Sequence, residues 1–182
     1  MMLPITGVRH IMDNLETTAS RIVELAQHSQ FDPFFLGPIP EDRLRAAERE
    51  LGVMFSGSYR AYLLYLGGAR MFGYNFDGLP DAIQSEDADL HYVSIIGNMD
   101  EYGGFSEGLP RSFVSLADNG GEVTFWVDTS IVENGESPIV AHVYGKYIRV
   151  SESFHDFVEL LTHLEDLHKR LSNKGRGAYN GV

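Results

Sequence analysis

The turn sequences between residues 113 and 150 constrain the fold of this chain more than any other feature. Asp118-Asn119-Gly120-Gly121, Asn134-Gly135 and Gly145-Lys146 are rich in residues that accept positive φ, and each separates two short apolar segments. Connections this short join antiparallel neighbours, because parallel strands need a crossover of about a dozen residues or more. The sequence therefore predicts four consecutive antiparallel strands, at residues 113–117, 123–128, 138–144 and 147–150.

Apolar residues at helical spacing predict helices on both sides of these strands. Residues 14–27, 40–51 and 58–66 each carry one apolar stripe between residues that favour helix starts and stops. A final helix begins after Ser151 or Ser153 and carries a stripe of phenylalanine, valine and leucine. Residues 72–76 alternate as a short strand does, and residues 92–96 are a further candidate strand.

This order of elements predicts an α+β fold. We expect N-terminal helices, an antiparallel meander sheet of about four to six strands, and a C-terminal helix packed on the sheet. The segment at residues 31–38 contains prolines and a glycine, so it separates the first helix from the rest of the chain. The expected division is a helical extension and linker at residues 1–38, the α+β domain at residues 39–171, and a flexible tail at residues 172–182.

The composition is typical of a cytoplasmic globular protein. No stretch approaches the run of about 20 apolar residues that a membrane helix needs, and the opening residues lack the apolar core of a signal peptide. The chain has no cysteine, which excludes disulfides, thiol nucleophiles and cysteine-based zinc sites. We therefore expect a cytoplasmic location and no association with a membrane.

The negative charge of the chain is concentrated in its middle. The formal net charge is −12, and residues 71–145 contain thirteen acidic residues and a single basic one, Arg111, so they carry all of it. Such a charge disfavours nucleic acid, because the phosphates would be repelled. It favours a basic protein partner and would speed the encounter with it.

The motifs that could carry catalysis or bind a metal are incomplete. Gly104-Phe105-Ser106-Glu107-Gly108 matches the G-x-S-x-G nucleophile elbow, but the strand and helix that the elbow joins are not predicted around it. His155, Glu159 and His163 share a helix face without the H-E-x-x-H pattern, so we interpret them as a solvated polar face. The acidic run around residue 86 lacks the glycine and closing glutamate of an EF-hand. We predict no catalytic residue, cofactor or metal.

The candidate partner-binding residues are five acids and one aromatic residue: Asp77, Asp81, Glu86, Asp87, Asp89 and Trp126. The acids lie in a loop-rich stretch, where nearby aromatic residues would supply apolar anchors inside a charged rim. The alternative is that these acids only keep the surface soluble. Trp126 is either an exposed anchor on the strand face of Thr124 and Asp128 or, if helices cover both faces of the sheet, a core residue.

Several segments, in the same order, resemble the SUKH superfamily, which is named after the yeast regulator of cell-wall and glucan synthesis. The first segments are Leu44-x-x-Ala47-Glu48-x-x-Leu51-Gly52-Val53, Ser58-Tyr59-Arg60-x-Tyr62-Leu63 and Gly67-Gly68. The later ones are the hairpin at residues 120–128 and the closing Ser153-Phe154-x-x-Phe157-Val158. The resemblance spans residues 40–164. Phe55-Ser56 stands where the family has Leu-Pro, and Leu66 stands where it has asparagine.

The resemblance implies a non-enzymatic scaffold that binds proteins. Bacterial members of the superfamily are mostly regarded as immunity proteins that neutralise nucleases or other toxins, so we expect a protein partner with a basic surface. An alternative is a regulatory adaptor of cell-wall or glucan synthesis, as in eukaryotic members. A third is a small hydrolase that uses Ser106 or a pair of acids. The matched residues are packing and turn residues, so the resemblance assigns no site.

Overall fold

The sheet is a seven-stranded antiparallel meander in the computed structural model, which describes residues 6–79, 95, 109–118, 123–143, 146–163, 167 and 171. Its strands follow one another in chain order, and each pairs with the next. They are β1 (Phe34–Phe35), β2 (Ala69–Met71), β3 (Tyr74–Phe76), β4 (Phe113–Asp118), β5 (Thr124–Asp128), β6 (Ile139–Val143) and β7 (Lys146–Ser151). The predicted α+β fold is confirmed, with β4 to β7 as the four expected strands.

The strand number is a correction to the predicted four to six. Residues 72–76 are not one strand, because Phe72 and Gly73 have φ values of 56° and 80° and form the turn that joins β2 to β3. The two residues of β1 pair with β2 at the edge of the sheet, in a segment predicted to be part of the linker. Of the candidate strand at residues 92–96, only Ile95 is described, and it is helical and buried.

The helices lie where apolar periodicity places them, with one large difference in length. They are α1 (Thr6–Gln27), α2 (Glu41–Leu51), α3 (Gly57–Leu66) and α5 (Phe154–Leu161). α1 begins eight residues before its predicted start at residue 14. Ser153 rather than Ser151 caps α5, and its Oγ accepts a hydrogen bond of 3.0 Å from the Asp156 N–H. None of the helices in the described ranges has both the length and the apolar character to span a bilayer.

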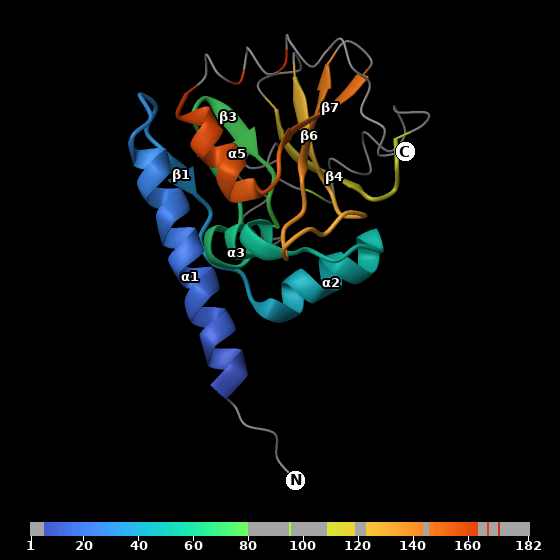
Figure 1. The fold of residues 1–182 in the computed structure, drawn as a ribbon. Helices are drawn as coiled ribbons and strands as arrows, with labels where there is room; N and C mark the ends of the chain where they lie inside the picture. Colours follow the sequence, from blue (N-terminus) through green and yellow to red (C-terminus); the bar gives the residue numbers. More distant parts are fainter. Residues whose placement is uncertain are drawn as a thin grey trace, which may run out of the picture.

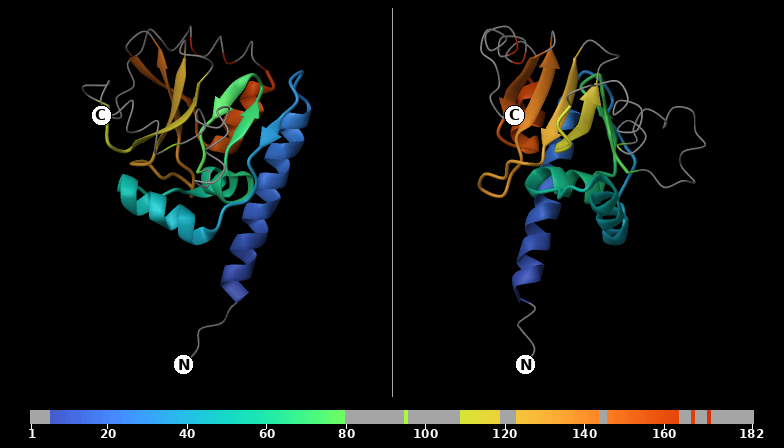
Figure 2. Two further views of the ribbon diagram at one scale, coloured as in Figure 1. Left: turned by 180° about the vertical axis from the view of Figure 1, so that it is seen from behind. Right: turned by 90° about the vertical axis from the view of Figure 1, so that its right-hand side faces the viewer.

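Helices α1, α3 and α5 pack against one another, and α5 lies over the sheet (Figures 1 and 2). The N-terminal part of α1 extends beyond the end of the molecule formed by α2 and α3. Further along the same helix Ala19, Ile22 and Ala26 are almost completely buried, so α1 is anchored in the main core rather than loosely attached.

Aromatic rings from α3, α5 and the sheet form the centre of that core. The ring of Phe154 lies 4.7 Å from that of Tyr62, and the ring of Phe157 lies 4.7 Å from that of Phe125. Such pairs add to the stabilisation that apolar burial itself provides. On the opposite face of the sheet a second buried cluster contains Trp126, so both faces of the central strands are buried.

Two tyrosines of α3 are equally buried but differ in their hydrogen bonding. The Tyr62 hydroxyl donates to the backbone oxygens of Asp77 at 3.0 Å and Phe76 at 3.2 Å. The Tyr59 hydroxyl is buried and has no hydrogen-bond partner in the part of the chain that the structure describes. Burial, with a smaller contribution from nearby Asp77, raises the pKa of Tyr59, and burial followed by neighbouring Tyr59 and Asp77 raises the pKa of Tyr62. Both side chains are therefore neutral in the folded protein.

This difference predicts opposite outcomes for two chemically identical substitutions. Tyr59→Phe removes a buried hydroxyl that satisfies nothing, so the free energy of unfolding should stay within about 0.5 kcal/mol of wild type or rise. Tyr62→Phe leaves two buried carbonyls without their donor and should lower it by about 1–2 kcal/mol. Urea denaturation measures both. Equal losses for the two variants would contradict the assignment.

Candidate functional site

A cleft of about 520 Å³ opens where α1 meets the β5–β6 connection and the start of α5. Four parts of the chain contribute to its walls, and most of the side chains are polar. The lining residues are Thr17, Thr18 and Arg21 of α1, Ser58 of α3, Glu133, Asn134 and Glu136 of the β5–β6 connection, and Glu152, Ser153, His155 and Asp156 at the start of α5.

The carboxylate of Glu136 anchors the cleft at the N-terminus of α3. Both of its oxygens lie 2.9 Å from the Ser58 backbone nitrogen, and the Ser58 hydroxyl donates to Oε2 at 2.7 Å. A helix N-terminus carries unpaired N–H groups and a partial positive charge, so it favours a carboxylate there. Gly57 has a φ of +50°, and a Cβ on it would lie 2.3 Å from the Glu136 carboxylate, so the approach needs glycine.

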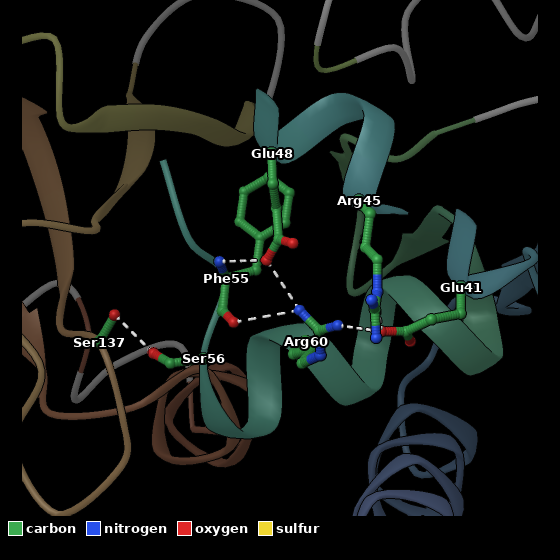
Figure 3. A network of polar contacts seen from close by, with 7 residues as sticks. All are labelled: Glu41, Arg45, Glu48, Phe55, Ser56, Arg60 and Ser137. Carbon is green, nitrogen blue, oxygen red and sulfur yellow. Dashed lines mark hydrogen bonds and ion pairs between the residues drawn. The ribbon is translucent and has the colours of Figure 1, made fainter. Parts of the chain in front are cut away.

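The same contact extends to α5. The Ser58 hydroxyl oxygen, while donating to Glu136, accepts a hydrogen bond of 3.0 Å from the backbone N–H of His155. Ser56, which stands at the N-cap of α3, makes no side-chain cap of its own and lies 2.8 Å from the Ser137 hydroxyl (Figure 3). Glu136 therefore replaces the local cap and joins the sheet, α3 and α5.

A tight turn and one arginine hold the other side of the cleft. Asn134 and Gly135 have φ values of 54° and 81°, as the predicted two-residue hairpin turn requires, and Glu133 and Glu136 exchange backbone hydrogen bonds of 2.8 and 2.9 Å across it. Arg149 of β7 donates to Glu133 at 2.8 Å and also pairs with Glu152. These contacts fix the positions of two carboxylates before any ligand arrives.

His155 is the histidine of the cleft, and it is half-buried. Its Nδ1 lies 3.8 Å from Asp156 Oδ1, whereas its Nε2 is shielded from solvent and has no hydrogen-bond partner among the described residues. His155, Asp156 and Glu159 each offer a ligand atom, and these atoms lie within 4.8 Å of one another. Both acids are exposed, and His163, which the sequence places on the same helix face, is not part of this group.

A second polar cluster, drawn in Figure 3, holds α2 against α3. Glu48 accepts hydrogen bonds from the Phe55 backbone N–H at 2.9 Å and from Arg60 at 2.7 Å, and Arg60 also pairs with Glu41. Arg45 binds the same Glu41 carboxylate at 3.1 Å. Arg60 is thus paired with two acids of α2, Glu41 and Glu48, so we interpret this cluster as structural.

The structure describes two of the six residues predicted to bind a partner, and both are buried. Asp77 is 1% exposed and accepts a hydrogen bond from the Ser115 hydroxyl, so its carboxylate lies inside the protein. Trp126 is 3% exposed and packs with Phe113 and Val140, as the core alternative describes. Asp81, Glu86, Asp87 and Asp89 lie outside the described residues, as does Ser106.

Little in the sequence points to the cleft. Asn134-Gly135 predicts a turn, but the acids beside it resemble any other solvated carboxylates. A weak signal is the Ser56-Gly57-Ser58 start of α3, where the glycine leaves space for an incoming group. The sequence does not predict that Glu136 fills this space, because Glu136 is 78 residues away from Ser58 and only tertiary structure brings the two together.

Removing the Glu136 carboxylate should destabilise the fold. Glu136→Ala leaves the N-terminus of α3 without its acceptor and should lower the free energy of unfolding by about 2–3 kcal/mol. The matched control is Glu133→Ala in the same turn, which loses one exposed ion pair and should cost less than about 1 kcal/mol. Chemical denaturation compares the two, and losses of similar size would show that Glu136 is an ordinary surface acid.

The comparisons with known proteins agree with this architecture. A search of curated proteins finds no significant match to the chain. The sequence model of one family, described as the SMI1 / KNR4 family (SUKH-1), matches residues 38–160. The match covers more than half of the chain and includes α2, α3, the described strands from β2 to β7, and most of α5. α1 precedes it. The chain therefore belongs to the SMI1 / KNR4 family (SUKH-1).

Proposed function

We propose that the chain is a non-enzymatic, cytoplasmic binding protein that acts as an immunity protein and neutralises a toxin domain with a basic surface. The observation that carries the proposal is membership of the SMI1 / KNR4 family over residues 38–160, which supports an immunity-type or SMI1/KNR4-like role in general. The specific choice of immunity rests on charge. An acidic protein can occupy the basic surface with which a nuclease holds phosphates, so a nuclease toxin is the leading candidate.

The acidic middle of the chain supports this choice. Residues 71–145 hold all of the net charge of −12, and a field of this kind accelerates the encounter with a cationic partner. We propose that Asp81, Glu86, Asp87 and Asp89 belong to the surface that attracts this partner electrostatically. Asp77 and Trp126 are buried, so they would not touch the partner.

The alternative is a regulatory adaptor of cell-wall or glucan synthesis, which the same family membership supports. The two functions use one fold and differ in partner. The identity of the partner distinguishes them. An immunity protein binds a toxin domain encoded beside the chain, whereas an adaptor binds synthase subunits in the membrane fraction.

Protection of cells is the direct test. The toxin domain encoded next to this chain should arrest growth when it is produced alone, and co-production of the chain should restore growth. Purified chain should bind that domain, and the variant with Glu86→Gln, Asp87→Asn and Asp89→Asn should associate several-fold more slowly at low salt but at the wild-type rate at high salt. Recovery of synthase subunits without any protection from a toxin would favour the adaptor instead.

A further inference from the structure

We infer that the cleft between α1, the β5–β6 connection and α5 is a binding site for a cationic group, a guanidinium or an ammonium. This deepens the proposed function and rests on it, because the group would then be an arginine or lysine side chain of the partner protein. The cleft has a volume of about 520 Å³, enough for one long basic side chain with its hydration. Nothing in the family match points to it, since one wall comes from α1, which precedes the matched residues 38–160.

The charges around the cleft favour a cation. Four carboxylates line it, those of Glu133, Glu136, Glu152 and Asp156, and Arg21 is the single cationic side chain among the described lining residues. Arg149 pairs with two of the four acids, which leaves the surroundings negative even when this arginine is counted. A concave surface lined by one sign of charge concentrates the field inside it.

The carboxylates are held in place in advance. Glu136 is fixed by three hydrogen bonds at the start of α3, and Glu133 and Glu152 share Arg149. A ligand would therefore not have to order these side chains, which removes that contribution to the cost of binding. Asp156 has a single neighbouring charge partner in the described structure, His155 at 3.8 Å, so it retains capacity to accept hydrogen bonds.

His155 lies beside Asp156, with its Nδ1 3.8 Å from Oδ1 of that carboxylate. The second ring nitrogen, Nε2, points away from Nδ1. This Nε2 is shielded from solvent and lacks a partner in the described ranges, although buried polar atoms are normally hydrogen-bonded. Because Nε2 is shielded, the hydrogen-bond acceptor that this part of the cleft offers to a guanidinium or ammonium group is the exposed Asp156 carboxylate.

Arg21 sets the selectivity of the cleft. This cationic residue lies on the α1 wall beside Thr17 and Thr18. It repels an incoming cation, so the ligand must bring enough favourable contacts to offset that repulsion. Because α1 lies outside the family match, we assign the discrimination between partners to this wall rather than to the shared fold.

Backbone amide chemical shifts of isotope-labelled protein test the inference with a defined probe. The capped peptide acetyl-Gly-Arg-Gly-amide should cause saturable shifts at Asn134, His155 and Asp156. The same peptide with citrulline, which has the shape of arginine without its charge, should not. Asp156→Asn should weaken the binding about two- to fivefold, and Arg21→Glu should strengthen it by a similar factor.

Matched controls separate a local effect from a change in net charge. Asp42 lies in the first turn of α2 as Asp156 does in α5, and Arg49 is an exposed arginine of α2 away from the cleft. Asp42→Asn and Arg49→Glu should leave the affinity for the arginine peptide unchanged. Equal effects of the control and cleft variants, or equal shifts with the citrulline peptide, would overturn the inference.

Two further outcomes identify the source of the cation and keep this inference distinct from the proposed function. Spermidine that shifts the same amides while the arginine peptide does not would establish a site for a free polyamine and overturn the protein side chain as its ligand. Wild-type protection from the toxin by the Asp156→Asn variant, with unchanged affinity for the toxin, would overturn the cleft as the partner's site and leave the immunity function standing. Binding of the arginine peptide to the cleft without any protection from the toxin would overturn the immunity function and leave the cleft standing as a cation site.

Discussion

The contact between the Glu136 carboxylate and the start of α3 is the interaction on which the arrangement of the sheet, α3 and α5 depends. It brings a negative charge to unpaired N–H groups, and Ser58 passes the connection on to the His155 backbone. The contact needs Gly57, because any Cβ there would collide with the carboxylate. One carboxylate thereby positions the β5–β6 turn and the start of α5, which together form two walls of the cleft.

α1 supplies a further wall of the cleft, beside the contact of Glu136 with the start of α3. Its buried residues, Ala19, Ile22 and Ala26, anchor it in the main core, and its polar residues then face the β5–β6 turn. Residues 38–160 match the SUKH-1 family, and both faces of the central strands in this region are buried. Folds are shared by proteins with different partners, so specificity has to come from what is added to them. In this chain one wall of the cleft comes from α1, which precedes the matched residues.

The sequence predicted the fold correctly where the residue types of a short segment determine its backbone conformation. Asn134-Gly135 identified the β5–β6 turn correctly, because asparagine and glycine both tolerate the positive φ that the turn requires. The β2–β3 turn was missed, because Phe72 is a bulky residue that rarely adopts positive φ and does so here within a buried environment. The site was missed for a related reason. Glu136 resembles a surface acid in the sequence, and only the folded chain brings it to Ser58.

Native-state hydrogen exchange at the His155 amide tests most directly whether the hydrogen bond from His155 to Ser58 depends on the Glu136 carboxylate. Glu136 does not touch that amide but holds the serine hydroxyl that does. In a Glu136→Gln variant, measured under conditions where it stays folded, the amides of Ser58 and His155 should both lose protection, while that of Ile148 in β7 keeps its wild-type exchange rate. Loss at Ser58 alone, with His155 unchanged, would contradict the account, because α5 would then be placed independently of the sheet.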